Sequence, residues 1–349
     1  MNLCPLVLVV FLAAGERSDY SQLMQQARAE YAGGRYGASE KLVVAAIQAL
    51  QSGEDSLRAA ALSELGDVYI SEDELFKAEN AYSESLAVYR RLSDKTNTAS
   101  LLQELGTLYS LQNRYDDALQ LLQQALKLTK TLPGSNASLM ASALDGLGMT
   151  YYRQGKTDKA GRFFNQALRL ISASGVKFKT SALLVNLGVV YIAKRKFQEA
   201  EDVLKQALKD VEAEVGPQHP DLIFVLTALG VLYTDSGRYA EAEGEYLRAL
   251  HILELRKPDT DTRIARILHR LSITYAKAGR KGEADVTLEK AAAIARQNLI
   301  QHPDMVTIVE HYSSNLRSAG KKKEADELRT EANRARISAG LVIKAHNPF

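Results

Sequence analysis

Four nitrogen-bearing side chains between residues 266 and 277 are well suited to bind a ligand. Arg266, His269, Arg270 and Lys277 lie at intervals that repeat roughly every helical turn. In an α-helix this spacing places them near one face, because residues three, four and seven apart lie above one another. Guanidinium and ammonium groups bind carboxylates through charge-assisted hydrogen bonds. The stretch therefore predicts a cationic surface that binds an acidic group of a partner.

Catalytic chemistry has no comparable signal in the sequence. No GxSxG, HExxH, Walker or dinucleotide-binding motif is present, and AGGRYG at residues 32–37 falls on an expected helix–helix turn. No pair of the six histidines has metal-ligand spacing, and the one cysteine, Cys4, lies in an apolar N-terminal segment. We therefore expect no enzyme, no cofactor and no metal site.

The N-terminal segment MNLCPLVLVVFLAAG, residues 1–15, has no charged side chain and ends in small residues before a polar stretch. Two interpretations are open, a secretory signal peptide and an apolar first helix of the fold. We favour the signal peptide because Pro5 and the abrupt change in polarity fit a repeat helix poorly. No later apolar run is long enough for a membrane helix, so we expect no integral membrane segment in the mature chain.

The rest of the chain is repetitive. The motif L-G-x-x-Y recurs at intervals of 40 or 42 residues. Its copies begin at Leu65, Leu105, Leu147, Leu187, Leu229 and, with Ser in place of Gly, Leu271. Nine residues after each Tyr comes an alanine, four residues further a bulky side chain, and three residues beyond that a small one.

Each copy has the pattern of two amphipathic helices. The L-x-x-L-G-x-x-Y residues fall on one helical stripe, and Ala242, Tyr246 and Ala249 form such a stripe on a second helix. Gly237 lies in the intervening turn, where it can adopt the positive φ that ends a helix. Such hairpins must stack on neighbours to bury their faces. We interpret the recurring Tyr as a packing residue rather than as an aromatic binding row.

This pattern resembles the tetratricopeptide repeat, and GRYAEAE, RALHILE and HPD with the 40–42-residue period resemble its kinesin-light-chain type. The resemblance implies an all-α fold, a right-handed superhelical solenoid of about eight stacked helix-turn-helix hairpins. It also implies a concave groove, lined by the first helices, that binds peptides or protein segments. Kinesin light chains clamp their ligands with pairs of asparagines. Asn186 is the only residue of this sequence that matches them, so that clamp is expected to be mostly lost.

The expected organisation has three parts: a signal peptide over residues 1–15, a repeat array over 16–336 and a C-terminal tail over 337–349. The hairpins are expected near residues 21–50, 57–92, 97–130, 139–173, 179–213, 220–255, 260–297 and 303–336.

The stripe expected to line the groove changes in character along the chain. It is acidic in the second and third hairpins, where it includes Glu64, Asp67 and Glu104, then apolar, and finally basic. The candidate peptide-binding residues are Met149, Tyr152, Arg153, Asn186, Val189, Phe224, Val231, Arg266, His269, Arg270 and Lys277.

Two interpretations of this stripe are open. In the first, it is a channel for a segment with apolar anchors and an acidic end near Arg266 and Arg270. In the second, Val185, Val189 and Ile192 pack under the neighbouring hairpin and the charged side chains are simply solvated.

The function that we favour is an exported, non-catalytic scaffold, periplasmic or secreted, that binds a protein or peptide. The alternative is a cytoplasmic adaptor or regulatory module that retains residues 1–15. The net charge of +2 over 349 residues gives no reason to expect a nucleic-acid partner.

Overall fold

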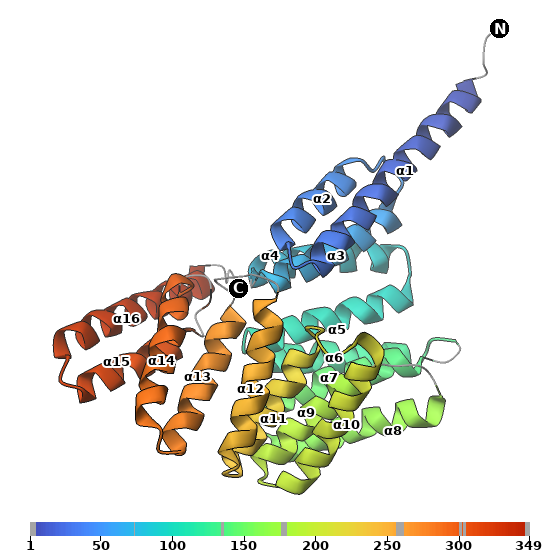
Figure 1. The fold of residues 1–349 in the computed structure, drawn as a ribbon. Helices are drawn as coiled ribbons and strands as arrows, with labels where there is room; N and C mark the ends of the chain where they lie inside the picture. The colour runs from blue at the N-terminus through green and yellow to red at the C-terminus, as the bar shows by residue number, and fades with distance from the viewer. Residues whose placement is uncertain are drawn as a thin grey trace. The chain divides into compact units, whose positions relative to one another are not determined.

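The chain folds into helical hairpins (Figure 1). The structure, a computed structural model, describes residues 5–72, 74–133, 136–175, 180–255, 262–299, 302 and 305–345, with side chains described from 19 to 337. These residues form sixteen helices and include no strand. They belong to two compact units, Met1–Phe178 and Lys179–Phe349, which are described separately.

Unit 1 is a stack of four hairpins. They are α1 (Pro5–Ala32) with α2 (Tyr36–Gln48), α3 (Asp55–Ser71) with α4 (Leu75–Arg91), α5 (Lys95–Leu111) with α6 (Tyr115–Thr129), and α7 (Ala137–Arg153) with α8 (Thr157–Ser174). The second helix of each hairpin packs on the first helix of the next, α2 on α3, α4 on α5 and α6 on α7.

Unit 2 has the same construction. Its hairpins are α9 (Thr180–Ala193) with α10 (Phe197–Val215), α11 (Leu222–Asp235) with α12 (Tyr239–Glu254), α13 (Thr262–Lys277) with α14 (Lys281–Gln297), and α15 (Val306–Ser318) with α16 (Lys322–Ala345). Again α10 packs on α11, α12 on α13 and α14 on α15. The expected all-α fold of eight helix-turn-helix hairpins is thus confirmed, with four stacked hairpins in each unit.

The glycine of each L-G-x-x-Y motif marks the closest approach of the two helices in a hairpin. A Cβ atom at Gly148 would lie 2.4 Å from Cε1 of Phe164, and one at Gly230 would lie 2.5 Å from Cε1 of Tyr246. Both aromatic side chains are fully buried. The bulky residue of the second helix therefore fills the space that a side chain at the glycine would need. Gly237 ends α11 with a φ of 80°, as its place in the turn predicts.

The two ends of the array are helical further than the repeat pattern predicts. Helix α16 continues to Ala345 and so includes most of the expected tail, because residues 337–345 contain one glycine and no proline to stop the helix. Helix α1 starts at Pro5 and includes residues 5–15 of the expected signal peptide, which stays a prediction. Within the described part of the chain, no helix combines the length and the apolar character that crossing a membrane requires.

Candidate binding surface

The first helices of unit 2 form one layer. Helix α9 contacts α11, α11 contacts α13 and α13 contacts α15. We term the side of this layer that faces away from the second helices the inner surface of unit 2. Helices α9, α11 and α13 carry a single acidic residue, Asp235, against three arginines and one lysine. Their combined charge is therefore positive, as the sequence predicts for the basic end of the stripe.

Phe224 of α11 is the most exposed of the predicted apolar residues. Its side chain is 70 % accessible to solvent. At the corresponding position of the neighbouring hairpins, six residues before the motif's glycine or serine, lie Ala182 and Arg266. A large apolar side chain left in water is informative because burial of Phe against a partner is favourable by about 1.5–3 kcal/mol. Phe224 can therefore serve as an apolar anchor for a ligand.

The other predicted apolar residues of unit 2 contribute mainly to packing. Val185, Val189 and Val231 are half-buried against the core of the unit, and Ile192 is buried within it. For Val185, Val189 and Ile192 the structure agrees with the packing interpretation of the stripe, and the predicted binding residue Val231 packs in the same way. Asn186, on α9, is also half-buried and already takes part in an interaction within the protein.

The predicted basic residues of α13 differ in their partners. Arg266, Arg270 and Lys277 are all exposed. Lys277 forms an ion pair of 3.0 Å with Asp235 of α11. No carboxylate pairs with the Arg270 side chain among the residues that the structure describes. Arg270 can therefore bind an acidic group of a partner without losing an internal ion pair.

His269 forms a pair with His311, which is not among the candidate binding residues. Its Nε2 lies 2.9 Å from Nδ1 of His311 on α15, and the two rings meet edge to face. Burial is the main cause that lowers the pKa of His269 to about 4, and the neighbouring His311 and Arg270 lower it further. Burial also lowers the pKa of His311. Both imidazoles are accordingly neutral at pH 7.

Three predicted residues belong to unit 1. Met149 and Tyr152 of α7 are half-buried, and Arg153, in the last turn of the helix, is exposed. They lie in a different unit from the eight predicted residues of unit 2. The structure therefore brings together the α9, α11 and α13 residues, and the continuous stripe through both units stays a prediction.

Unit 1 has an acidic group on its first helices, as the sequence predicts. Asp67 of α3 accepts a hydrogen bond of 2.6 Å from the Tyr82 hydroxyl, and Glu64 pairs with Arg28 of α1. Although Glu104 of α5 is open to solvent, the surrounding protein desolvates its carboxyl and, with the negative charge of Asp67, raises its pKa to about 7. Desolvation raises the pKa of Asp67 as well.

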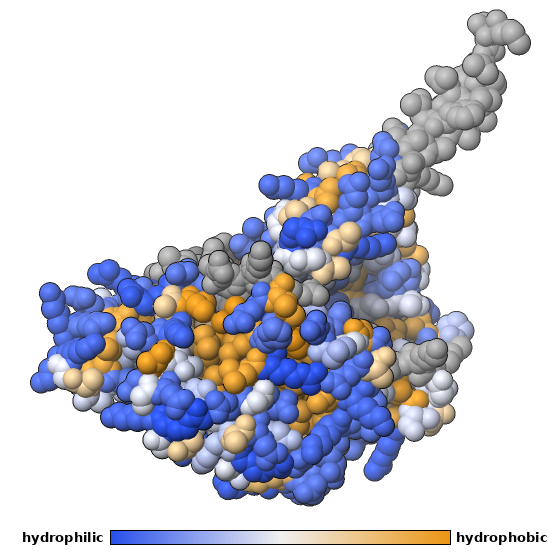
Figure 2. All heavy atoms as spheres, in the orientation of Figure 1, coloured by the Kyte–Doolittle hydropathy of each residue, from blue (hydrophilic) through white to orange (hydrophobic). Residues whose placement is uncertain are grey.

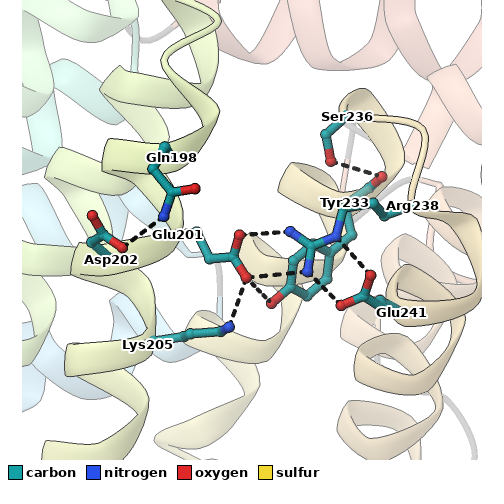
Figure 3. A network of polar contacts seen from close by, with 8 residues as sticks. All are labelled: Gln198, Glu201, Asp202, Lys205, Tyr233, Ser236, Arg238 and Glu241. Carbon is teal, nitrogen blue, oxygen red and sulfur yellow. Dashed lines mark hydrogen bonds and ion pairs between the residues drawn. The ribbon is translucent and has the colours of Figure 1, made fainter.

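A polar network joins consecutive hairpins of unit 2 (Figure 3). Arg238, at the start of α12, binds the buried Glu201 of α10 at 2.6 Å and Glu241 at 2.6 Å. Its guanidinium lies 4.3 Å from the centre of the Tyr233 ring, whose hydroxyl donates to Glu201 at 3.2 Å. Lys205 also pairs with Glu201 at 2.7 Å. Because all these groups satisfy one another, we assign the network to hairpin stacking rather than to ligand binding.

The network recurs in both units. Arg280 lies 4.3 Å from the ring centre of Tyr275 and binds Glu243. In unit 1, Arg114 lies 3.6 Å from the ring centre of Tyr109 and binds Glu79 at 3.0 Å. Tyr109, Tyr233 and Tyr275 thus have a structural role, in line with the interpretation from the sequence.

Exposed apolar side chains also occur away from the inner surface of unit 2. On the visible face, Figure 2 shows apolar atoms around α12 and α13, within a mostly polar surface. Leu247 of α12 is 48 % exposed, and Leu255, which directly follows that helix, is 53 % exposed. Leu247 lies on a second helix, which makes it a useful comparison for Phe224 in an experiment.

Local motifs do not reveal the contacts between hairpins, but the repeat interval of the sequence does. His311 follows His269, and Lys277 follows Asp235, by 42 residues, which is the repeat interval in this part of the chain. Residues one period apart occupy equivalent places on adjacent first helices. Comparing residues at this interval could have identified both pairs.

Models of the tetratricopeptide repeat match three sets of residues in the chain. The matches cover residues 57–131 and 179–255, residues 104–174, and residues 264–304. The chain therefore belongs to the tetratricopeptide repeat family. No curated protein matches it.

Solved structures support the same fold. The chain is similar to BtubC (BKLC) from P. vanneervenii, with 24% identity, a TM-score of 0.54, and coverage of 63% of this chain and 90% of that one. A Rap protein complexed with Competence and Sporulation Factor has 15% identity and a TM-score of 0.63, with 81% and 76% coverage. The apo form of RapI has 14% identity and a TM-score of 0.58, with 79% and 97% coverage.

Proposed function

We propose that this protein is an exported scaffold that binds an acidic protein segment on the inner surface of unit 2. Membership of the tetratricopeptide repeat family makes it a protein–protein interaction scaffold, and the choice of surface and ligand is our proposal. The observation that carries it is the pairing of features on neighbouring helices. Phe224 of α11 is 70 % exposed, and Arg270 of α13 has no acidic partner among the described residues.

The ligand that fits these features has one large apolar side chain and a nearby carboxylate. The apolar side chain would cover Phe224, and the carboxylate would accept hydrogen bonds from Arg270 and the adjacent Arg266. A repeat array is a preformed surface, so little ordering cost is expected on the protein side. One similar structure, the Rap protein, is complexed with Competence and Sporulation Factor, which supports ligand binding by an array of this kind.

A charge-reversal variant tests the surface. Arg266→Glu combined with Arg270→Glu should weaken binding of the partner by tenfold or more, because each carboxylate contact becomes repulsive. The matched control is Lys209→Glu with Lys290→Glu, which reverses two exposed charges on the second helices α10 and α14. Equal affinities for the two double variants, measured by titration calorimetry, would exclude the inner surface of unit 2 as the binding site.

Export is a second part of the proposal, supported by the composition of residues 1–15. The alternative is a cytoplasmic adaptor or regulatory module in which these residues are retained at the start of α1. The two differ in the N-terminal residue of the protein isolated from its cells.

A further inference from the structure

The His269–His311 pair has no role so far, either in the packing of the fold or in the proposed binding surface. The two residues come from adjacent hairpins, α13–α14 and α15–α16, and occupy equivalent positions one repeat apart. His269 is half-buried and His311 is exposed, so the pair lies at the boundary between protein and solvent.

The distance between the two nitrogens is close to that of two ligands of one metal ion. Nε2 of His269 and Nδ1 of His311 are 2.9 Å apart. In a tetrahedral site with metal–nitrogen bonds of about 2.0–2.1 Å, two imidazole nitrogens lie about 3.3 Å apart. A separation a few tenths of an ångström larger, which the exposed His311 side chain can provide by rotation, would admit a metal ion between them.

The chemistry of the pair agrees with this geometry. A metal ligand must offer a lone pair, and a neutral imidazole has one on the ring nitrogen that carries no proton. Each neutral ring carries one proton, which would occupy the nitrogen that faces away from the metal. Metal binding at neutral pH therefore needs a change of tautomer and no net loss of protons.

We propose that His269 and His311 bind a divalent transition metal that prefers imidazole ligands, such as Zn²⁺ or Ni²⁺, and so link the last two hairpins. The site has two protein ligands, since the described residues include no group of three or more His, Cys, Asp or Glu side chains placed to hold a metal. The remaining coordination positions would be taken by water or by a carboxylate of a ligand bound at the inner surface of unit 2.

The link between hairpins gives the site a measurable effect on stability. A metal that binds the folded state and joins α13 to α15 stabilises that state by an amount that grows with the logarithm of the ratio of metal concentration to dissociation constant, and so raises the unfolding temperature. The nearby Arg270 repels a dication, because its positive charge already acts on His269. Arg270→Ala should therefore tighten metal binding, whereas it should weaken binding of an acidic segment.

The test uses the full chain without a histidine tag. Zn²⁺ and Ni²⁺ should each bind with one-to-one stoichiometry in calorimetry and raise the unfolding temperature, and Mg²⁺, which prefers oxygen ligands, should do neither. His311→Ala should weaken the affinity about tenfold or more. The matched control, His251→Ala, removes an exposed histidine of α12 and should leave the affinity unchanged.

Two results would overturn the proposal. One is the absence of saturable Zn²⁺ or Ni²⁺ binding by the unmodified chain, and the other is binding that survives both His311→Ala and His269→Ala. The unfolding temperature of each variant without metal shows whether it is folded, and the exposed His311 side chain makes the first variant the decisive one.

Discussion

The guanidinium of Arg238 joins two hairpins of unit 2 by binding Glu201 at 2.6 Å while it covers the ring of Tyr233 at 4.3 Å (Figure 3). Glu201 is buried, and its hydrogen bonds to Arg238, followed by those to Lys205, lower its pKa to about 2. The contact thus combines an ion pair, a cation–π contact and a hydrogen bond from a tyrosine hydroxyl. It connects the start of α12 to α10.

Removal of this arginine should destabilise the protein. At pH 7 we expect Arg238→Ala to lower the free energy of unfolding by about 1–2 kcal/mol, because Glu201 loses its main partner in a buried position. The deficit should shrink as the pH falls from about 4.5 towards 2, since protonation of Glu201 removes the ion pair from the unmodified protein too. Urea denaturation over this pH range measures the effect.

Lys156 provides the matched control. It occupies the equivalent position in unit 1, but Leu119 stands where the acidic partner would be. Lys156→Ala should change the free energy of unfolding by less than about 0.5 kcal/mol. A loss in Arg238→Ala no larger than in this control would show that the network does not hold the hairpins together.

The motif glycines should tolerate no side chain. Gly148→Ala would put a Cβ 2.4 Å from Phe164 and should lower the free energy of unfolding by about 1–3 kcal/mol through overpacking. Gly244 of α12 has no atom within 4 Å of a Cβ built on it, so Gly244→Ala should stabilise the helix by up to about 1 kcal/mol. Denaturant unfolding of both variants checks the opposite signs, and equal effects would contradict the packing account.

Glu104 should make the stability of unit 1 depend on pH. Its folded pKa, raised to about 7, lies above the ordinary value of 4.5, so the folded protein keeps a proton that the unfolded chain has lost. Its contribution to stability is therefore present below about pH 4.5 and is lost as the pH rises through 7. Glu104→Gln should be more stable than the unmodified protein at pH 8 and similar to it at pH 4.

A direct titration of the Glu104 carboxyl by NMR complements this comparison. Asp67→Asn should lower the pKa of Glu104, since it removes the neighbouring negative charge, although desolvation, the larger cause, stays. A Glu104 pKa at its ordinary value in the unmodified protein would disprove the account of the acidic group.

The N-terminus of the native protein distinguishes the two proposed locations. If residues 1–15 are a signal peptide, the mature chain should begin near Glu16 and be found outside the cytoplasm. Intact-mass and N-terminal analysis of cell fractions measures both properties. A cytosolic chain that begins with Met1 would favour the adaptor alternative and would make the apolar start of α1 part of the fold.

The hairpins could be predicted because their signal is local and repeated. The spacing of Leu, Gly, Tyr and Ala fixes which faces are buried, and Gly148 and Gly230 lie against the bulky side chains that the pattern indicates. The extent of α16 was not predictable in this way, because the tail has no repeat motif. The helix nevertheless continues to Ala345.

The inner surface could be predicted only in part. Whether Val189 is covered depends on the neighbouring hairpin, and the residue pattern of its own helix does not indicate that contact. The same stripe contains Phe224, which is left largely exposed. The pairing of His269 with His311 likewise depends on the stacking of two hairpins, and residues 42 positions apart have no local metal-ligand spacing.

Site-specific photo-crosslinking tests most directly the claim that the inner surface of unit 2 binds a protein segment. A photoreactive phenylalanine analogue is placed at Phe224 or, as the control, at Leu247 of α12, in cells that make the protein. We predict a partner adduct from position 224 that disappears when Arg266→Glu and Arg270→Glu are added, and no such adduct from position 247. Adducts of equal yield at both positions, or an adduct at 224 that is insensitive to the charge reversal, would contradict the account.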